Sequence, residues 1–219
     1  MKLKLYAADG SETGDREVSG FPSFEGNAGV DALRQVIIAI QANRRQGSAS
    51  TKIRSEVRGS GRKIHRQKGL GVGRVGDRFA VQRRGGGVVF GPKPRSFNKK
   101  VNRKMKRLAL ARALFDGAAE DKFSLIEEWK VAEPKTKLFT QVLDKMIPDA
   151  RSVLLVGGVL DSDDAFADEF SLAARNVARA TLGRAQDLNP LDLVGADKVI
   201  FSAEGLDILL AKLGREESS

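Results

Sequence analysis

Residues 44–107 read RRQGSASTKIRSEVRGSGRKIHRQKGLGVGRVGDRFAVQRRGGGVVFGPKPRSFNKKVNRKMKR. These 64 residues hold 21 of the chain's 38 lysines and arginines but only two acids, Glu56 and Asp77. The stretch carries a net charge of +19, and the other 155 residues carry −9 of the total of +10. Like charges at this density repel, and there is little apolar surface to bury. We therefore expect a slightly acidic domain with an inserted basic segment that cannot fold back on itself and needs a polyanion.

The composition excludes several kinds of site. The chain has no cysteine, so disulfide frameworks, cysteine-based zinc sites and thiol nucleophiles are excluded. His65 is the only histidine, which removes multi-histidine metal sites and argues against a histidine-based catalytic triad. No apolar run approaches the roughly 20 residues that span a bilayer, and Met1–Tyr6 lacks the apolar core of a signal peptide. We expect an intracellular, soluble protein.

Outside the basic segment, strand and helix patterns alternate. Strand patterns lie at residues 2–6, 123–129, 152–156, 176–182 (the weakest) and 198–201. Helical spacing occurs at residues 27–43, 101–115, 134–146, 163–174 and 204–213, whereas residues 9–26 read as a loop. Strands separated by helices of this length indicate βαβ units and a largely parallel, layered sheet.

Residues 45–98 have no sustained periodicity of either kind. They include 11 glycines, and an insertion of this length in a compact domain is usually functional or disordered. We divide the chain into a globular α/β domain, residues 1–44 and 99–219, and an extended basic Gly/Arg-rich RNA-binding loop, residues 45–98. Phe79, Phe90, Phe97 and the Gly91–Pro94 turn argue against a merely solvated tail.

Arginine pairs bidentately with phosphates and stacks on bases. We therefore infer binding to folded RNA through phosphates and shape. Cations also fill the first turns of the helix expected from Val101, where they oppose the helix dipole unless phosphates bind there. The candidate RNA-binding residues are Arg44, Arg45, Lys52, Arg54, Arg58, Arg62, Lys63, His65, Arg66, Gln67, Lys68, Arg74, Arg78, Arg83, Arg84, Lys93, Arg95, Lys99, Lys100, Arg103, Lys104 and Arg107.

Four other features have plainer explanations. Gly71–Gly76 matches GxGxxG, but a dinucleotide site needs a strand before it and a helix after it. Asp161–Asp164 lacks the glycine and distal glutamate of a calcium loop and is typical of a helix cap. Glu127 and Glu128 fit a solvated strand end. Trp129 lies in the globular part, so we expect it to pack there.

Several motifs resemble the large-subunit ribosomal protein family L-four, bacterial type. They are RQGSASTK at 45–52, EVRGSGRK at 56–63, RQKG at 66–69 and GGGVVFGPKPR at 85–95. The likeness continues through residues 104–113, 132–137 and 173–176, so it covers nearly the whole chain. Three departures stand out: Ile64–His65 replaces a proline-aromatic pair, residues 70–73 interrupt a glycine-arginine run, and Arg83 stands where tryptophan is common.

The resemblance implies a three-layer α/β/α domain, which we expect to contain a largely parallel four-stranded sheet, plus the long extended basic loop. It also implies that the loop is buried in large-subunit (23S) rRNA. The family's loop tip lines the polypeptide exit tunnel near ribosomal protein L-twenty-two. By the matched motif, Arg66, Gln67, Lys68 and Gly69 are the expected tunnel-tip residues.

We therefore expect a structural constituent of the large ribosomal subunit, located on cytoplasmic ribosomes. Its partners would be 23S rRNA and neighbouring ribosomal proteins, notably L-twenty-two, with no catalytic residues, metal, cofactor, membrane contact or small-molecule substrate. One alternative is a nucleotide-dependent α/β enzyme that clamps nucleic acid with the basic segment. Its only candidate phosphate turn is Gly157–Gly158, which lacks the lysine of a P-loop. A second alternative is a free regulator that uses the same segment.

Overall fold

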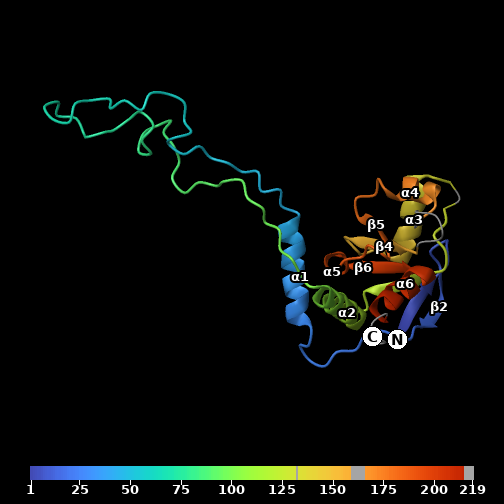
Figure 1. The fold of residues 1–219 in the computed structure, drawn as a ribbon. Helices are drawn as coiled ribbons and strands as arrows, with labels where there is room; N and C mark the ends of the chain where they lie inside the picture. Colours follow the sequence, from blue (N-terminus) through green and yellow to red (C-terminus); the bar gives the residue numbers. More distant parts are fainter. Residues whose placement is uncertain (132, 159–165, 215–219) are drawn as a thin grey trace. The chain divides into compact units, whose positions relative to one another are not determined.

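The structure, a computed structural model, describes residues 1–131, 133–158 and 166–214. Within these residues a six-stranded sheet has the order β2-β1-β3-β6-β4-β5 (Figure 1). The strands are β1 (Lys2–Tyr6), β2 (Glu12–Glu17), β3 (Phe123–Ile126), β4 (Val153–Gly157), β5 (Ala180–Arg184) and β6 (Lys198–Ser202). Only the β1–β2 pair is antiparallel, so the expectation of a largely parallel sheet is confirmed.

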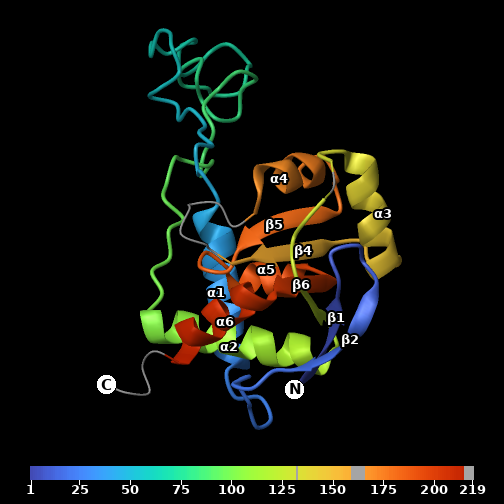
Figure 2. The ribbon, with the colours of Figure 1, turned by 90° about the vertical axis from the view of Figure 1, so that its right-hand side faces the viewer.

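Helices cover both faces of this sheet, which confirms the three-layer α/β/α arrangement (Figures 1 and 2). They are α1 (Val30–Asn43), α2 (Arg103–Ala119), α3 (Thr136–Met146), α4 (Asp168–Ala174), α5 (Pro190–Gly195) and α6 (Ala203–Gly214). One apolar cluster joins the sheet to α2, α5 and α6, and a second joins it to α3 and α4. Every residue of β3 and β4 is buried, as continuous apolar runs covered on both faces predict.

The expectation of four strands is wrong, because the sheet extends further at its edges. β2 reads ETGDRE, and all six of its residues are exposed. It pairs antiparallel with β1, from Lys2 opposite Glu17 to Tyr6 opposite Glu12. Because none of its side chains is buried, its sequence has no alternation of apolar and polar residues that would reveal a strand. The reading of residues 9–26 as loop is therefore corrected for β2. Strand β5, at the opposite edge, is only partly buried; it begins four residues later and ends two residues later than the predicted strand at 176–182.

Two helices differ from the sequence prediction. The short helix α5 was not predicted, although its sequence carries a start signal: Asn189 and Asp192 form a capping box and Pro190 opens the first turn. Helix α4 begins at Asp168 in the described structure, whereas the predicted start, Asp163–Asp164, lies outside the described residues.

Arg112 is a charged residue on the buried side of α2, with only 8% of its surface exposed. Its guanidinium donates to the carbonyls of Gly26 and Ala28 at 2.8 and 3.0 Å, and pairs with Asp116 at 2.9 Å. The group therefore fastens the segment before α1 to α2. The buried guanidinium charge is tolerated because two carbonyls and the Asp116 carboxylate accept hydrogen bonds from it.

We predict that Arg112→Met destabilises the chain by about 1–3 kcal/mol, because it removes the charge-assisted hydrogen bonds of the buried guanidinium to the carbonyls of Gly26 and Ala28 and to the carboxylate of Asp116. Urea denaturation followed by circular dichroism measures the change. Arg151→Met, at an exposed side chain, is the matched control and should change stability by less than about 0.5 kcal/mol. Equal effects of the two substitutions would contradict the anchoring role of Arg112.

Candidate nucleic-acid interface

Residues 41–99 form a compact unit of their own, separate from the unit of residues 1–40 and 100–219. The smaller unit is fully described, and residues 44–99 contain neither helix nor strand. The unit holds 16 lysines and arginines against two acids, a net charge of +14. We call residues 44–99 the basic loop.

The two ends of the basic loop are fastened to each other. Asn43 bonds Lys99 in both directions, accepting from its backbone N–H at 2.7 Å and donating to its carbonyl at 3.3 Å. The N–H of Arg95 donates to the carbonyl of Gly47 at 3.2 Å. Nothing in the helical or strand periodicity of the sequence points to Asn43, so its role was not predicted.

Phe97 organises two arginines beside this closure. The guanidinium carbons of Arg45 and Arg95 lie 3.9 and 4.6 Å from the centre of its ring. Cation–π contacts of this kind orient a guanidinium without neutralising it. The hydrogen-bonding edges of both arginines therefore remain available for an anionic partner.

The outgoing and returning halves of the basic loop, which we call its limbs, are also hydrogen-bonded to each other. Thr51 N–H donates to Pro92 O at 3.0 Å, and Val88 N–H donates to Lys52 O at 2.9 Å. Phe79 and Ala80 are buried within the unit. The expectation that this segment cannot fold back on itself is therefore wrong for its limbs. Charge repulsion is overcome locally because backbone groups make the contacts while the charged side chains point outwards.

One glycine shows how closely the limbs approach. A Cβ on Gly87 would lie 2.2 Å from the backbone nitrogen of Arg54, a distance that no side chain can occupy. By contrast, a Cβ on Gly73 would meet nothing within 4 Å. Position 87 therefore needs glycine, because the neighbouring limb leaves no space for a side chain. Position 73 has space for one.

Both acids of the unit are used internally. Glu56 pairs with Lys93 at 2.6 Å, and Asp77 pairs with Arg54 at 3.0 Å. The hydrogen bond from Lys93, followed by that from the N–H of Ile53, lowers the pKa of the Glu56 carboxyl below its usual value. The acids therefore tie limbs together and leave a large positive excess.

The expected tunnel-tip residues form an exposed turn. The guanidinium of Arg66 donates to the carbonyl of Gly69 at 3.1 Å, and Gly69 has φ +87°, a conformation that favours glycine. Gln67 accepts from Lys63. Arg66, Gln67 and Lys68 are all exposed.

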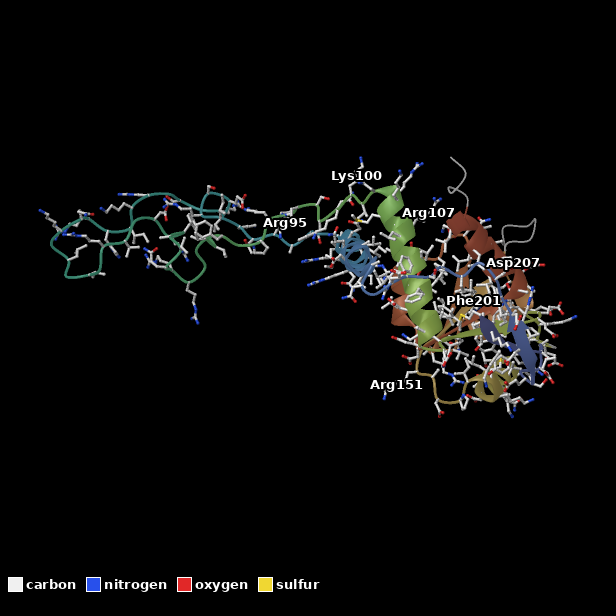
Figure 3. The ribbon with its side chains drawn as sticks, turned by 90° about the horizontal axis from the view of Figure 1, so that it is seen from below. Arg95, Lys100, Arg107, Arg151, Phe201 and Asp207 are labelled. Atoms are coloured by element: carbon white, nitrogen blue, oxygen red, sulfur yellow. The ribbon has the colours of Figure 1, made fainter. Side chains whose placement is uncertain are left out.

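The 22 candidate RNA-binding residues fall into two groups. Eighteen lie in the unit of residues 41–99, and Lys100, Arg103, Lys104 and Arg107 lie in the other unit at the start of α2. Figure 3 labels Lys100 and Arg107 there. Arg83 and Arg107 are partly buried and the other 20 are exposed. One nitrogen of Arg83, Nη1, is buried without a hydrogen-bond partner, as is Oδ1 of Asp77.

The start of α2 lacks the groups that usually stabilise a helix N-terminus. Asn102 precedes the helix but makes no side-chain cap, and the first turn contains no acid. Arg103, Lys104 and Lys106 instead place positive charge against the positive end of the helix dipole. Bound phosphates would convert this repulsion into attraction.

The turn after β4 is closed to a nucleotide phosphate. The N–H of Gly158 donates to Ser202 Oγ at 3.1 Å, and the same oxygen accepts from Gly205 N–H at 3.0 Å. A Cβ on Gly158 would lie 3.0 Å from the Cβ of Glu204. The proposed phosphate turn of an α/β enzyme is therefore filled by the start of α6.

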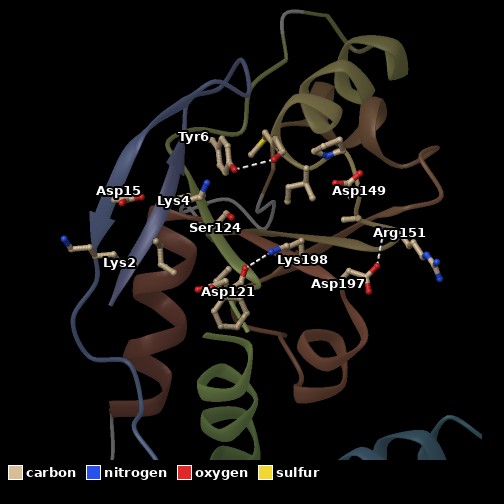
Figure 4. A pocket seen from close by; sticks show the side chains of 16 residues that line it. Lys2, Lys4, Tyr6, Asp15, Asp121, Ser124, Asp149, Arg151, Asp197 and Lys198 are labelled. Atoms are coloured by element: carbon tan, nitrogen blue, oxygen red, sulfur yellow. Dashed lines mark hydrogen bonds between the residues drawn. The ribbon is translucent and has the colours of Figure 1, made fainter. Parts of the chain in front are cut away.

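A hollow of about 760 Å³ lies elsewhere on the larger unit, beside the first residues of β3 and β6 (Figure 4). Three of its polar groups make structural hydrogen bonds: Tyr6 donates to Met146 O, Lys198 donates to Asp121 O, and Asp197 accepts from the N–H of Arg151. Burial raises the pKa of Tyr6, so its hydroxyl stays neutral. Ligands of open α/β sheets bind at the carboxyl ends of strands, and this hollow lies at the amino ends.

The remaining motifs have structural roles. Gly71–Gly76 has no strand before it and no helix after it, which rules out a dinucleotide site there. Trp129 packs against Phe170 at 5.3 Å between ring centres, which confirms its packing role. Glu127 and Glu128 are exposed after β3. Asp161–Asp164 lies outside the described residues.

In residues 1–131, 133–158 and 166–214, no three histidine, cysteine or acidic side chains are grouped so that they could hold a metal ion. Over the same ranges, no helix is both long enough and apolar enough to cross a membrane.

An α/β/α domain joined to a polycationic loop defines a class of basic, loop-bearing proteins suited to an anionic partner. The chain belongs to the Ribosomal protein L4/L1 family, which matches residues 22–212. It is therefore a ribosomal protein and not an enzyme.

Three curated relatives carry the name large ribosomal subunit protein uL4. The protein from Brevibacillus brevis is 41% identical over 206 residues, covering 94% of this chain and 95% of that protein. The Nostoc punctiforme protein is 41% identical, covering 80% of this chain and 81% of its own length. The Salinibacter ruber protein is 34% identical, covering 100% of this chain and 99% of its own length.

We predict that a disulfide forms between Lys52→Cys and Val88→Cys, because the hydrogen bond between these residues brings their backbones within disulfide reach. The natural chain has no cysteine, so oxidation followed by mass spectrometry reads out this pair alone. Adding Gly87→Ala should lower the yield by separating the limbs.

The control pairs Lys52→Cys with Val72→Cys, which closes a shorter loop and is therefore favoured by chain entropy alone. Limb pairing requires the 52–88 disulfide to form in the higher yield. Equal or greater yield in the control would show that the limbs are not held together.

Proposed function

We propose that this chain is a structural constituent of the large ribosomal subunit that binds 23S rRNA. The basic loop would enter the rRNA and its tip would reach the polypeptide exit tunnel. Membership of the large subunit is supported by the three relatives described above, which all carry the name of a large-subunit protein. Contact with rRNA and a position at the exit tunnel are supported by the charge and shape of the basic loop.

The observation that carries the proposal is the net charge of +14 on residues 41–99. The two acids of this unit are already paired with Lys93 and Arg54, so they offer little further neutralisation. RNA phosphates supply the missing negative charge, and their condensed counterions are released on contact. Such contacts would also let RNA helices approach each other that otherwise repel.

The limbs' hydrogen bonds give this charge a shape. Backbone pairing at Thr51–Pro92 and Lys52–Val88 leaves arginine and lysine side chains exposed on the outside. Arginine forks read phosphate geometry bidentately and stack on bases, which suits folded RNA without demanding a base sequence. A narrow paired loop also fits the space between RNA helices better than a globular lobe would.

The same reasoning extends to the partners. An exposed turn at Arg66–Gly69 is where we place the tunnel wall, with ribosomal protein L-twenty-two as its proposed neighbour. The cytoplasmic ribosome is the proposed location. Cofractionation of the chain with large subunits in sucrose at moderate salt tests the proposal against a free regulator, which would sediment apart from them.

We predict that replacing Arg58, Arg62, Lys63 and Arg66 together by glutamine lowers affinity for 23S rRNA and flattens its salt dependence. The slope of log K against log salt should fall by about 3, since each phosphate contact contributes roughly 0.7–0.9. Filter binding across salt concentrations measures both quantities.

The matched control replaces four exposed lysines of the larger unit, Lys130, Lys135, Lys137 and Lys145, by glutamine. This control removes the same amount of positive charge. If only the net charge of the protein mattered, both variants would lose the same rRNA affinity and the same salt dependence. An unchanged slope in the loop variant, or the same decrease in both variants, would contradict binding through the loop.

We predict that Lys68→Glu leaves the α/β/α domain stable but alters the exit tunnel, because it reverses a charge on the exposed turn. Ribosomes carrying the substitution should differ in nascent-chain passage and in sensitivity to tunnel-binding drugs. Asp149→Lys, an exposed charge reversal in the larger unit, is the control. Normal passage and drug sensitivity in Lys68→Glu ribosomes would count against the tunnel position.

A further inference from the structure

A pocket of about 270 Å³ opens between the first turns of α2, the segment before α5 and the end of α6. Its floor is apolar: Leu110, Leu188, Pro190 and Leu213 line it, and the first three are buried. All of these residues belong to the larger unit. The volume is near the lower end of the roughly 300–1,000 Å³ typical of small-molecule pockets, so the pocket suits one small group rather than a helix.

The rim of the pocket is cationic. Arg103, Lys106 and the partly buried Arg107 come from α2, and Lys212 comes from α6, so four positive side chains from two helices line the pocket. The pocket lining contains no acid. Two acids stand nearby: Asp187 interacts electrostatically with Lys212, and Asp192 accepts from the N–H of Asn189 in the α5 cap. An anionic ligand therefore meets a positive rim.

Lys212 also has a structural role, since its ammonium donates to the carbonyl of Gln186 at 2.6 Å. Burial lowers its pKa, and Asp187 opposes that effect. A phosphate at the rim would stabilise the charged form further. At the start of α2, which also lines the pocket, Asn102 makes no side-chain cap and the first turn contains no acid.

We propose that this pocket holds a single unstacked nucleotide of RNA, with the base on the apolar floor and its phosphate at the rim formed by Arg103, Lys106 and Lys212. RNA-binding proteins commonly take bases that are splayed out of a helix. A protein surface that binds only phosphates needs only cations. This pocket has, in addition, an apolar recess inside its cationic rim, which can hold a base. The inference rests on the proposed function and adds a second RNA contact, outside the basic loop.

The first test uses the full chain with labelled leucine methyl groups, observed by NMR. The probes are a mixed-sequence RNA hexamer and tripolyphosphate, a polyanion without bases. We expect the hexamer, but not tripolyphosphate, to shift the methyl signals of Leu110, Leu188 and Leu213. Absence of these shifts, or identical shifts with tripolyphosphate, would overturn the proposal.

Charge variants locate the effect. Lys106→Glu combined with Lys212→Glu should weaken the hexamer-induced shifts by about tenfold, as expected for two lost charge-assisted contacts. Lys137→Glu combined with Lys145→Glu, at two exposed lysines of α3 outside the pocket lining, should change them by no more than about twofold. Unchanged methyl signals of Leu154 and Leu155 in β4 verify that each variant is folded. Equal weakening by the two sets would overturn the assignment.

The second test uses intact large subunits with a photoreactive phenylalanine analogue in place of Leu213. An adduct with one rRNA nucleotide supports the proposal, whereas an adduct with a neighbouring protein overturns it. The same analogue in place of Val72 reports on the basic loop. An RNA adduct at position 72 without one at position 213 would refute the pocket but leave the proposed function standing; loss of both would refute both.

Discussion

The positive charge of residues 41–99 is the constraint on which the rest of the structure depends. A net charge of +14 in one small unit cannot be neutralised by its two acids. Both acids are spent on holding the limbs, through Glu56–Lys93 and Asp77–Arg54. Backbone hydrogen bonds and close glycine contacts define the shape of the unit, but its positive excess is not matched by its own acids, so we expect a polyanion to be needed to hold that shape firmly.

The larger unit, in contrast, is held together by apolar packing. Its parallel strands β3, β4 and β6 are buried on both faces, and two apolar clusters join them to helices. Arg112 shows how a charge is accepted in such a setting, with a carboxylate and two carbonyls as partners. The carboxyl end of β4 is closed by Ser202, so this α/β/α domain lacks the opening that nucleotide-binding sheets use there.

Sequence patterns predicted the parts of this structure that depend on side-chain burial. The apolar runs of β4 and β6 and the helical spacing of α1, α2, α3 and α6 are visible without coordinates. Strand β2 was missed because none of its side chains is buried, so its sequence shows no apolar alternation; backbone pairing and two exposed ion pairs, Lys2–Glu17 and Lys4–Glu12, join it to β1. Helix α5 was missed because six residues are too few for a periodic signal, although the Asn189–Asp192 capping box was readable.

The basic loop illustrates the same limit. Its charge and glycines indicated a polyanion partner, but the pairing of its limbs arises from contacts such as Val88–Lys52, between backbone groups far apart in the sequence. Likewise, the recess between α2 and α6 joins residues from both helices that no local motif links. Charge composition thus predicts a polyanion partner for the segment, whereas the form of the segment depends on non-local contacts.

Amide hydrogen exchange across residues 44–98, with and without 23S rRNA, tests the central claim most directly. Few buried apolar contacts support the limbs, so their amides should exchange much faster than those of β4 in the free chain. Binding of rRNA should then protect Thr51, Gly87 and Val88 strongly. If these amides are as protected without RNA as with it, the unit is stable despite its unneutralised charge, and the account given above is wrong.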